Sequence, residues 1–239
     1  MYSGFTVTIL AQNNALSSVV AIIYCTLCAL ALASHAKTTF TDPGSIPHSA
    51  VPNEDDGGNH HEFPMCSVCE TYKPKYCHHC RICNRCISGM DHHCPWMNNC
   101  IGKGNLKHFT LFLVYVWLAS AYALVLFGLN YFLCNREECT FPDVLVQLVR
   151  IMTVLCIGAF YFTSNMIISV LWGIVTGLGI IDRMKGDVVQ EAPIPWKDVF
   201  GIQHYFTWLL PIDPVFEDYD RVMKYSTVPR LLREKKMEQ

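Results

Sequence analysis

The sequence predicts a mainly α-helical membrane protein with three transmembrane helices and a cytoplasmic, zinc-bound, cysteine-rich domain of short hairpins and turns. Hydrophobic residues make up 51% of the 239 residues and charged residues only 16%, below the roughly 25% that is usual for soluble domains. Three long apolar stretches interrupt the chain. Between them, eight of the 13 cysteines fall within residues 66–100.

The apolar stretches lie at about 15–34, 109–133 and 151–181. Each has at least about 18 residues without a charge, which is long enough to cross a bilayer as a helix. Buried core helices are the alternative, but three such stretches in so short a chain argue against it. A cleaved signal peptide is the alternative for the first stretch. It lacks the basic start and the clear A-x-A site that signal peptides carry.

Lysine and arginine set the expected orientation, because they favour the cytoplasmic side. The linker at 35–65, the cysteine-rich domain at 66–108 and the tail at 182–239 carry most of them, so we expect all three in the cytoplasm. The start at 1–14 and the loop at 134–150 are expected on the opposite side, the lumen or the exterior. The net charge of −2 does not suggest a nucleic-acid partner.

The segments outside the cysteine-rich domain show few motifs. Asp42-Pro43-Gly44 is a turn signal that ends the first helix, and the pair His60-His61 is expected on the surface of the linker. Cys134 and Cys139 lie in the expected lumenal loop. A disulfide there and two free thiols remain open. We find no internal repeat.

The cysteine spacing predicts metal binding. On the reducing side of a membrane, dense cysteines favour metal over disulfides, and a C-x2-C pair lets two thiolates hold one tetrahedral zinc. Adjacent side chains in extended backbone point in opposite directions, so His79 and Cys80 should serve different ions. Eight residues then form two closed Cys3His sites, Cys66, Cys69, His79 and Cys86 around one zinc, and Cys80, Cys83, His93 and Cys100 around the other. Closed sites are structural.

Two residues stay outside this partition. Cys77 is interpreted as a free thiol. His78 is interpreted as a surface or ligand-contacting residue rather than a ninth zinc ligand.

The run Asp91-His92-His93-Cys94 places a nucleophile, a base and an orienting acid together. A thiol with a pKa near 8.5 needs a base to attack at neutral pH, and a carboxylate on the imidazole fixes its tautomer. If His93 binds zinc, His92 is free to act as that base. A spare thiol or an alternative ligand is the other interpretation of Cys94.

The run CSVCETYKPKYCHHCRICNRCISGMDHHCPWMNNCIGKGNLKHF resembles the cysteine-rich domain of the DHHC family of protein S-acyltransferases. The DHHCPW run, the following NNC-x-G-x-x-N and the zinc spacing carry the resemblance. It implies that Cys94 carries a long-chain fatty acyl group, palmitoyl in this family, which is taken from acyl-CoA for delivery to cytoplasmic cysteines of membrane-associated proteins. It implies that His92 is the base, that Asp91 orients it, and that two structural zinc ions are bound. We expect a multi-pass protein of the Golgi apparatus or endoplasmic reticulum.

Basic residues in the same domain are candidates for the CoA phosphates, which need cations. Lys73 and Lys75 are the main candidates, with Arg81 and Lys103 nearby. Contact with anionic lipid headgroups is the equally weighted alternative.

Three departures from the family leave other functions open. The chain shows three spans where the family has four or more, the Thr-Thr-x-Glu motif is replaced by Thr176-Gly177-Leu178-Gly179 and Asp182, and DPVFEDYDRV only loosely resembles the family's tail motif. The alternative is therefore a truncated, weak or inactive form that acts as a zinc-stabilised membrane adaptor. A zinc hydrolase is disfavoured, because closed sites leave no position for water.

Overall fold

The computed structural model describes residues 18–52, 64–133, 143–186 and 192–227. It confirms the predicted fold class, with long apolar helices, short antiparallel hairpins and clustered cysteines and histidines. The chain divides into two compact units. Met1–Ser34 and Thr110–Ser169 form the helical unit, and His35–Phe109 and Val170–Gln239 form the cysteine-rich unit.

Several expectations fall outside the described residues. These are the extracytoplasmic start at 1–14, the surface pair His60-His61, the thiols Cys134 and Cys139, and the basic end of the tail.

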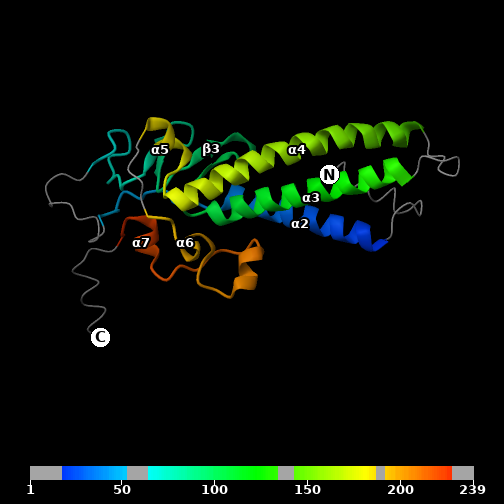
Figure 1. Ribbon diagram of the computed structural model, residues 1–239. Helices are drawn as coiled ribbons and strands as arrows, with labels where there is room; N and C mark the ends of the chain where they lie inside the picture. The colour runs from blue at the N-terminus through cyan, green and yellow to red at the C-terminus, as the bar shows by residue number, and fades with distance from the viewer. Residues whose placement is uncertain (1–17, 53–63, 134–142, 187–191, 228–239) are drawn as a thin grey trace. The chain divides into compact units, whose positions relative to one another are not determined.

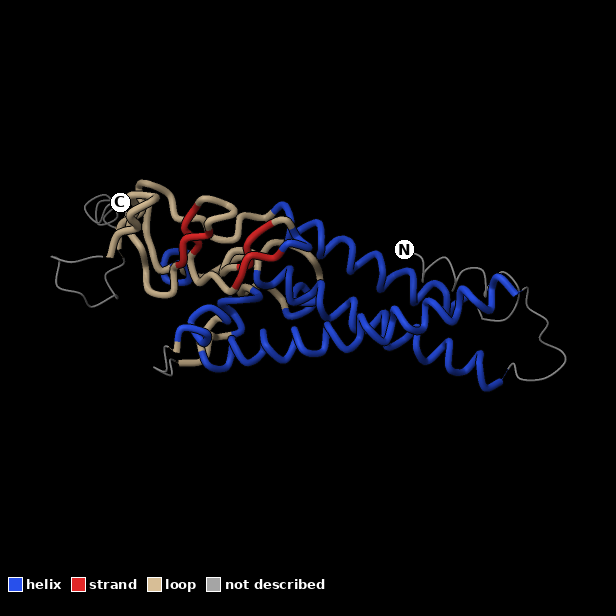
Figure 2. Tube along the Cα trace, turned by 90° about the horizontal axis from the view of Figure 1, so that it is seen from above, coloured by secondary structure: helices blue, strands red, loops and turns tan. Residues whose placement is uncertain are grey.

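Three helices lie side by side in the helical unit, as both views show (Figure 1, Figure 2). They belong to α2 (Ser18–Phe40), α3 (Leu106–Leu133) and α4 (Asp143–Thr176). Their shared core contains buried Tyr24, Ala123, Phe127, Met152 and Cys156. These apolar side chains are in contact with one another between the helices, and their close packing holds the three helices together.

The outward surface of this unit is also apolar, with Val19 63%, Ile22 63% and Val154 69% exposed. Ser18–Phe40, Leu106–Leu129 and Val146–Thr176 are long and apolar enough to cross a membrane. Helices that are hydrophobic all round suit lipid rather than water.

The last long helix differs from the apolar stretch that predicted it. That stretch runs over 151–181, whereas α4 begins at Asp143 and ends at Thr176. Gly177 follows with φ of 70°, the left-handed conformation with which glycine commonly ends helices. Apolar residues after Gly177 therefore lie outside α4, and the short helix α5 (Ile180–Lys185) begins there.

The described residues of the cysteine-rich unit include two hairpins of three-residue strands. Strand β1 (His78–Cys80) pairs with β2 (Arg85–Ile87), and β3 (His92–Cys94) pairs with β4 (Asn99–Ile101), both antiparallel. A short 3₁₀ helix, η2 (Pro95–Met97), joins the second pair. Asn84 and Asn98 take left-handed conformations, with φ of 50° and 47°, in the two connections. Asparagine tolerates this conformation better than most residues.

Two buried asparagines of the NNC-x-G-x-x-N run fasten these hairpins to the end of α2. The Asn99 amide donates to the carbonyls of Thr38, Thr39 and Thr41 at 3.0–3.1 Å. The Asn105 amide donates to the carbonyls of Thr38 and Cys100 at 3.2 and 2.9 Å. The last carbonyls of a helix have no partner within it, so these side chains cap α2.

A glycine in the same run allows close packing of the turn that follows α2. A Cβ on Gly102 would lie 2.5 Å from the Pro43 carbonyl oxygen and 2.7 Å from Ile87 Cγ2. Only glycine leaves room for the backbone there. The Asp42-Pro43-Gly44 turn is thereby held against the second hairpin.

After α5, the described part of the tail, residues 192–227, forms three short helices, α6 (Trp196–Phe200), η3 (Tyr205–Leu209) and α7 (Tyr219–Met223). Buried Lys107 anchors it by donating to the carbonyls of Thr207 and Ile212 at 3.0 and 2.9 Å. The Ser88 hydroxyl donates to the Met223 carbonyl at 2.5 Å. These hydrogen bonds hold segments far apart in sequence within the cysteine-rich unit.

Candidate active site and metal centres

The first group of possible metal ligands gathers at the first hairpin. Cys66, Cys69, His79 and Cys86 offer ligand atoms that all lie within 4.8 Å of one another. His79 Nδ1 lies 3.8, 3.2 and 3.9 Å from the sulfurs of Cys66, Cys69 and Cys86. His79 and Cys86 face each other across the hairpin, which explains why residues seven apart meet.

The second group repeats this arrangement at the second hairpin, where His93 faces Cys100. Cys80, Cys83, His93 and Cys100 again lie within 4.8 Å. His93 Nδ1 lies 3.7, 3.4 and 3.6 Å from the sulfurs of Cys80, Cys83 and Cys100. The structure thus brings together the same two sets of four that the sequence predicted.

Both groups fit zinc. Three thiolates and one imidazole are a donor set that zinc prefers, and bonds of about 2.0–2.3 Å in a tetrahedron put ligand atoms about 3.3–3.8 Å apart. The observed separations from the imidazole nitrogens, 3.2–3.9 Å, match this spacing. The two clusters can therefore hold zinc ions.

The two clusters also reveal a repeat that the sequence analysis missed. Every member of the second cluster follows its counterpart in the first by 14 residues. The hairpins repeat in the same way, because His78-His79-Cys80 becomes His92-His93-Cys94. The H-H-C-x3-N-x-C-I pattern, which residues 78–87 and 92–101 share, is the sequence signal from which this repeat could have been predicted.

The predicted catalytic residues come together beside the second cluster. The Asp91 carboxylate lies 2.8 Å from His92 Nδ1 through Oδ2. His92 interacts with the thiol of Cys94, which is 5% exposed. The Phe109 ring packs edge-on against the His92 ring, with centroids 5.4 Å apart. A thiol, an imidazole and a carboxylate are thus held in one chain of contacts.

The electrostatics of this chain favour an ionised thiol. Burial lowers the pKa of His92, but the hydrogen bonds to Asp91 and to Cys94 outweigh burial and raise that pKa to about 9. Burial raises the pKa of the Cys94 thiol, but His92 and the backbone N–H groups of Met97 and Trp96 lower it, and the net shift is downward. A protonated imidazole beside a thiolate is the pair that such shifts favour.

Cys77 and His78, the two residues left outside the predicted zinc sites, have different surroundings. Burial raises the pKa of the Cys77 thiol to about 11, which disfavours the thiolate form that acts as a nucleophile. His78 lies outside both clusters, and its Nε2 lies 2.6 Å from Asp182 Oδ1.

The basic residues named as CoA candidates separate into different places. A surface hollow of about 440 Å³ includes Lys73, Arg81 and Lys185 in its lining. Lys75 is exposed and lies outside that lining, with its Nζ 5.0 Å from the centroid of the Tyr76 ring.

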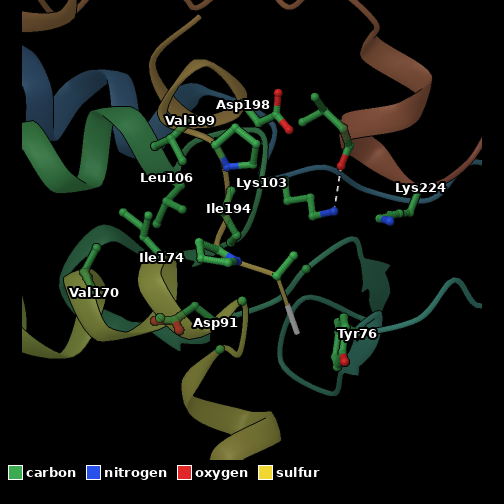
Figure 3. Close-up of a pocket in the computed structure, with 18 of the residues that line it drawn as sticks. Tyr76, Asp91, Lys103, Leu106, Val170, Ile174, Ile194, Asp198, Val199 and Lys224 are labelled. Atoms are coloured by element: carbon green, nitrogen blue, oxygen red, sulfur yellow. Dashed lines mark hydrogen bonds between the residues drawn. The ribbon is translucent and has the colours of Figure 1, made fainter. Parts of the chain in front are cut away.

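Lys103 lines a second pocket, of about 350 Å³ (Figure 3). Its Nζ donates to the Val222 carbonyl at 2.6 Å. Figure 3 shows Asp91 at the edge of the same pocket, close to Val170 and Ile174 of α4.

Two contacts at this site were missed by sequence reasoning. The backbone N–H of Ile180 donates to Asp91 Oδ1 at 2.9 Å, and Asp182 pairs with His78. A backbone donor carries no sequence signature, and the Asp182–His78 pair joins residues 104 apart.

The described residues define a membrane protein with two cysteine–histidine clusters that can hold zinc. Beside the second cluster, a thiol, an imidazole and a carboxylate lie in contact. Comparison with known proteins gives the same class. The sequence profile of the family described as DHHC palmitoyltransferase matches residues 59–187.

Curated relatives agree with the profile. Palmitoyltransferase ZDHHC7 of Mus musculus is 35% identical over 231 residues, covering 88% of this chain and 74% of the relative. Palmitoyltransferase ZDHHC3 of Homo sapiens is 33% identical, covering 87% and 74%. Probable protein S-acyltransferase 12 of Arabidopsis thaliana is 28% identical, covering 83% and 75%. The chain belongs to the DHHC palmitoyltransferase family, a family of protein S-acyltransferases, and the predicted resemblance is confirmed.

Proposed function

We propose that the protein transfers a long-chain fatty acyl group, palmitoyl above all, from acyl-CoA to cytoplasmic cysteines of membrane-associated proteins. The observation that carries the proposal is the Asp91–His92–Cys94 contact chain, with its 2.8 Å bond between Asp91 and His92. The relatives named as palmitoyltransferases support the choice of acyl group.

In the first step, the Cys94 thiolate attacks the carbonyl carbon of the acyl-CoA thioester. A new bond forms between Cys94 sulfur and the acyl carbon, and the bond to the CoA sulfur breaks. The His92 imidazolium gives its proton to the departing CoA thiolate. Asp91 holds His92 through Nδ1, which orients the ring throughout.

In the second step, neutral His92 takes the proton of the substrate cysteine thiol. The resulting thiolate attacks the acyl carbon on Cys94, and Cys94 leaves as a thiolate beside the protonated His92. Each step exchanges one thioester for another, so the overall equilibrium is nearly balanced. The enzyme therefore contributes positioning and proton transfer.

The two zinc sites have a structural role in this proposal. Bound zinc would supply folding free energy to a unit whose described strands are only three residues long. The proposed ligands are those of the two clusters, and Cys94 belongs to neither. Because His93 is a proposed ligand directly before Cys94, coordination would fix the backbone that carries the nucleophile.

The hollow of about 440 Å³ is the proposed contact for the CoA phosphates. Lys73 and Arg81 line it, and Lys185 adds a third cation. Clustered cations favour phosphate groups. Lys75, the other residue that the sequence indicated, lies outside this lining, so we propose no contact between Lys75 and the CoA phosphates.

The cysteine-rich unit is proposed to face the cytoplasm, at a Golgi or endoplasmic reticulum membrane. The distribution of lysine and arginine along the sequence supports this orientation. The three apolar helices support membrane insertion.

The proposal is tested by incubating the purified, detergent-solubilised protein with palmitoyl-CoA and a cysteine peptide. The expected result is CoA release in step with palmitoylation of the peptide, and loss of both in the Cys94→Ala variant. A zinc-bound protein that releases no CoA would contradict the proposal and would favour a membrane adaptor.

A further inference from the structure

The proposed mechanism leaves one contact network of the cysteine-rich unit unused. His78 Nε2 lies 2.6 Å from Asp182 Oδ1, and His78 Nδ1 lies 3.1 Å from Lys185 Nζ. The side chains of His78 and Asp182 are only 12% and 3% exposed. Asp182 and Lys185 both belong to α5, so His78 of strand β1 holds this short helix at two of its residues.

The beginning of α5 contacts the proposed catalytic carboxylate. The Ile180 N–H donates to Asp91 Oδ1 at 2.9 Å, while Asp91 Oδ2 lies 2.8 Å from His92 Nδ1. Both carboxylate oxygens are thus engaged. An Asp91 held at both oxygens can present only one edge to His92, so the position of Ile180 sets the direction of the His92 ring.

Gly179 lies between the two carboxylates. A Cβ there would come within 3.4 Å of both Asp91 Oδ1 and Asp182 Oδ2, and within 3.3 Å of the Met90 carbonyl oxygen. Its φ and ψ of −66° and 169° are open to any residue. An alanine Cβ would therefore fit with ordinary contacts to both carboxylates and a slightly tight contact with the Met90 carbonyl, so the backbone at Gly179 packs closely between Asp91 and Asp182.

The 14-residue repeat gives this network a second, independent argument. His78 occupies in the first hairpin the position that His92 occupies in the second. Each of the two rings pairs with a carboxylate. The cysteine two places after His78 is Cys80, which belongs to the second metal cluster. The cysteine two places after His92 is Cys94, which belongs to neither cluster. The first hairpin thus has an imidazole–carboxylate pair without a thiol for it to activate.

We propose that His78 and Asp182 are positioning residues for the acyl-transfer reaction, which hold α5 so that the Ile180 N–H fixes Asp91. This inference rests on the proposed function, because it gives Asp91 and His92 their catalytic parts. It also separates two roles on one helix. Gly179, Ile180 and Asp182 affect the chemical step, whereas Lys185, which lines the hollow proposed for CoA, affects acyl-CoA binding.

The test uses single-turnover formation of the acyl-enzyme over a range of palmitoyl-CoA concentrations, with zinc content measured on the same samples. Asp182→Ala and Asp182→Leu should lower the maximal rate roughly 10- to 100-fold, as misplaced catalytic groups do, with unchanged half-saturation and two zinc ions. Asp182→Asn should restore most of the rate, because its amide oxygen can still accept from His78. Lys185→Ala should raise half-saturation, because Lys185 lines the hollow proposed for CoA.

Asp198→Asn is the matched control. Its carboxylate lines the pocket that Asp91 also lines (Figure 3), but it pairs with Arg221 at 2.7 Å. Its rate should equal that of wild type.

Two results overturn the inference while leaving the proposed function intact. One is a normal maximal rate in Asp182→Ala or, should that variant lose zinc, in Asp182→Leu, which keeps the side-chain volume but cannot accept from His78. The other is an Asp182→Asn variant as slow as Asp182→Ala, since the hydrogen bond would then not be what matters. A wild-type protein that forms no acyl-enzyme contradicts the proposed function itself.

Discussion

Two adjacent histidines should respond to substitution in opposite ways. His92 contacts Asp91 and Cys94, whereas His93 belongs to the second metal cluster. We predict that His92→Ala loses acyl-enzyme formation but keeps both zinc ions. His93→Ala should lose one zinc and the stability of the cysteine-rich unit, because metal binding and folding are coupled.

The size of the His92 effect follows from its contacts. His92 lowers the pKa of the Cys94 thiol, and a thiol with an ordinary pKa near 8.5 is only about 3% ionised at pH 7, so loss of the base reduces the thiolate available for attack. The variant also lacks the proton donor for the CoA thiolate. The total should reach about 10²-fold or more, the usual contribution of a general acid–base group.

The assay is hydroxylamine-sensitive acylation at saturating palmitoyl-CoA, beside zinc analysis of each purified variant. His48→Ala, a change at an exposed histidine of the same unit, is the control and should match wild type in both readouts. Equal zinc loss in His92→Ala and His93→Ala would refute the division of roles. So would a His92→Ala variant that acylates at the wild-type rate.

Three further predictions concern the support of the site. Asn99→Ala should destabilise the protein by about 2–4 kcal/mol, because loss of the buried Asn99 amide leaves several backbone carbonyls without a hydrogen-bond donor. An unchanged thermal midpoint in detergent would contradict this. Lys73→Ala combined with Arg81→Ala should raise the KM for acyl-CoA roughly 3- to 30-fold, as two exposed ion pairs would allow. Lys75→Ala should leave KM unchanged, and an unchanged KM in the double variant would favour lipid contact. Zinc removal by a chelator should abolish acylation together with the fold of the cysteine-rich unit, and activity that persists without zinc would contradict a structural role.

The grouping of the cysteines and histidines was predictable because it depends on local geometry. Neighbouring side chains of a strand point to opposite faces, so His79 and Cys80 had to separate. The same rule separates His92 from His93. The hairpins that bring His79 to Cys86 and His93 to Cys100 are formed by neighbouring strands, so these pairings depend on local sequence only.

The supporting contacts were not predictable, because they join distant parts of the chain. Asp182 meets His78 across 104 residues, and nothing in either local sequence indicates the other. Ile180 acts through its backbone N–H, which every residue except proline possesses. Lys107 is 1% exposed, although lysine is rarely buried. Only the fold shows that backbone carbonyls of the tail surround its ammonium group.

The most direct test of the account is to locate the acyl group after reaction with palmitoyl-CoA. Mass spectrometry of the intact protein and of its peptides should find one hydroxylamine-labile palmitoyl group, on Cys94. Cys94→Ser should lose that thioester while keeping two zinc ions, because Cys94 lies outside both clusters. A labile palmitoyl group at the wild-type level in Cys94→Ser, on any other cysteine, would contradict the assignment of Cys94 as the nucleophile.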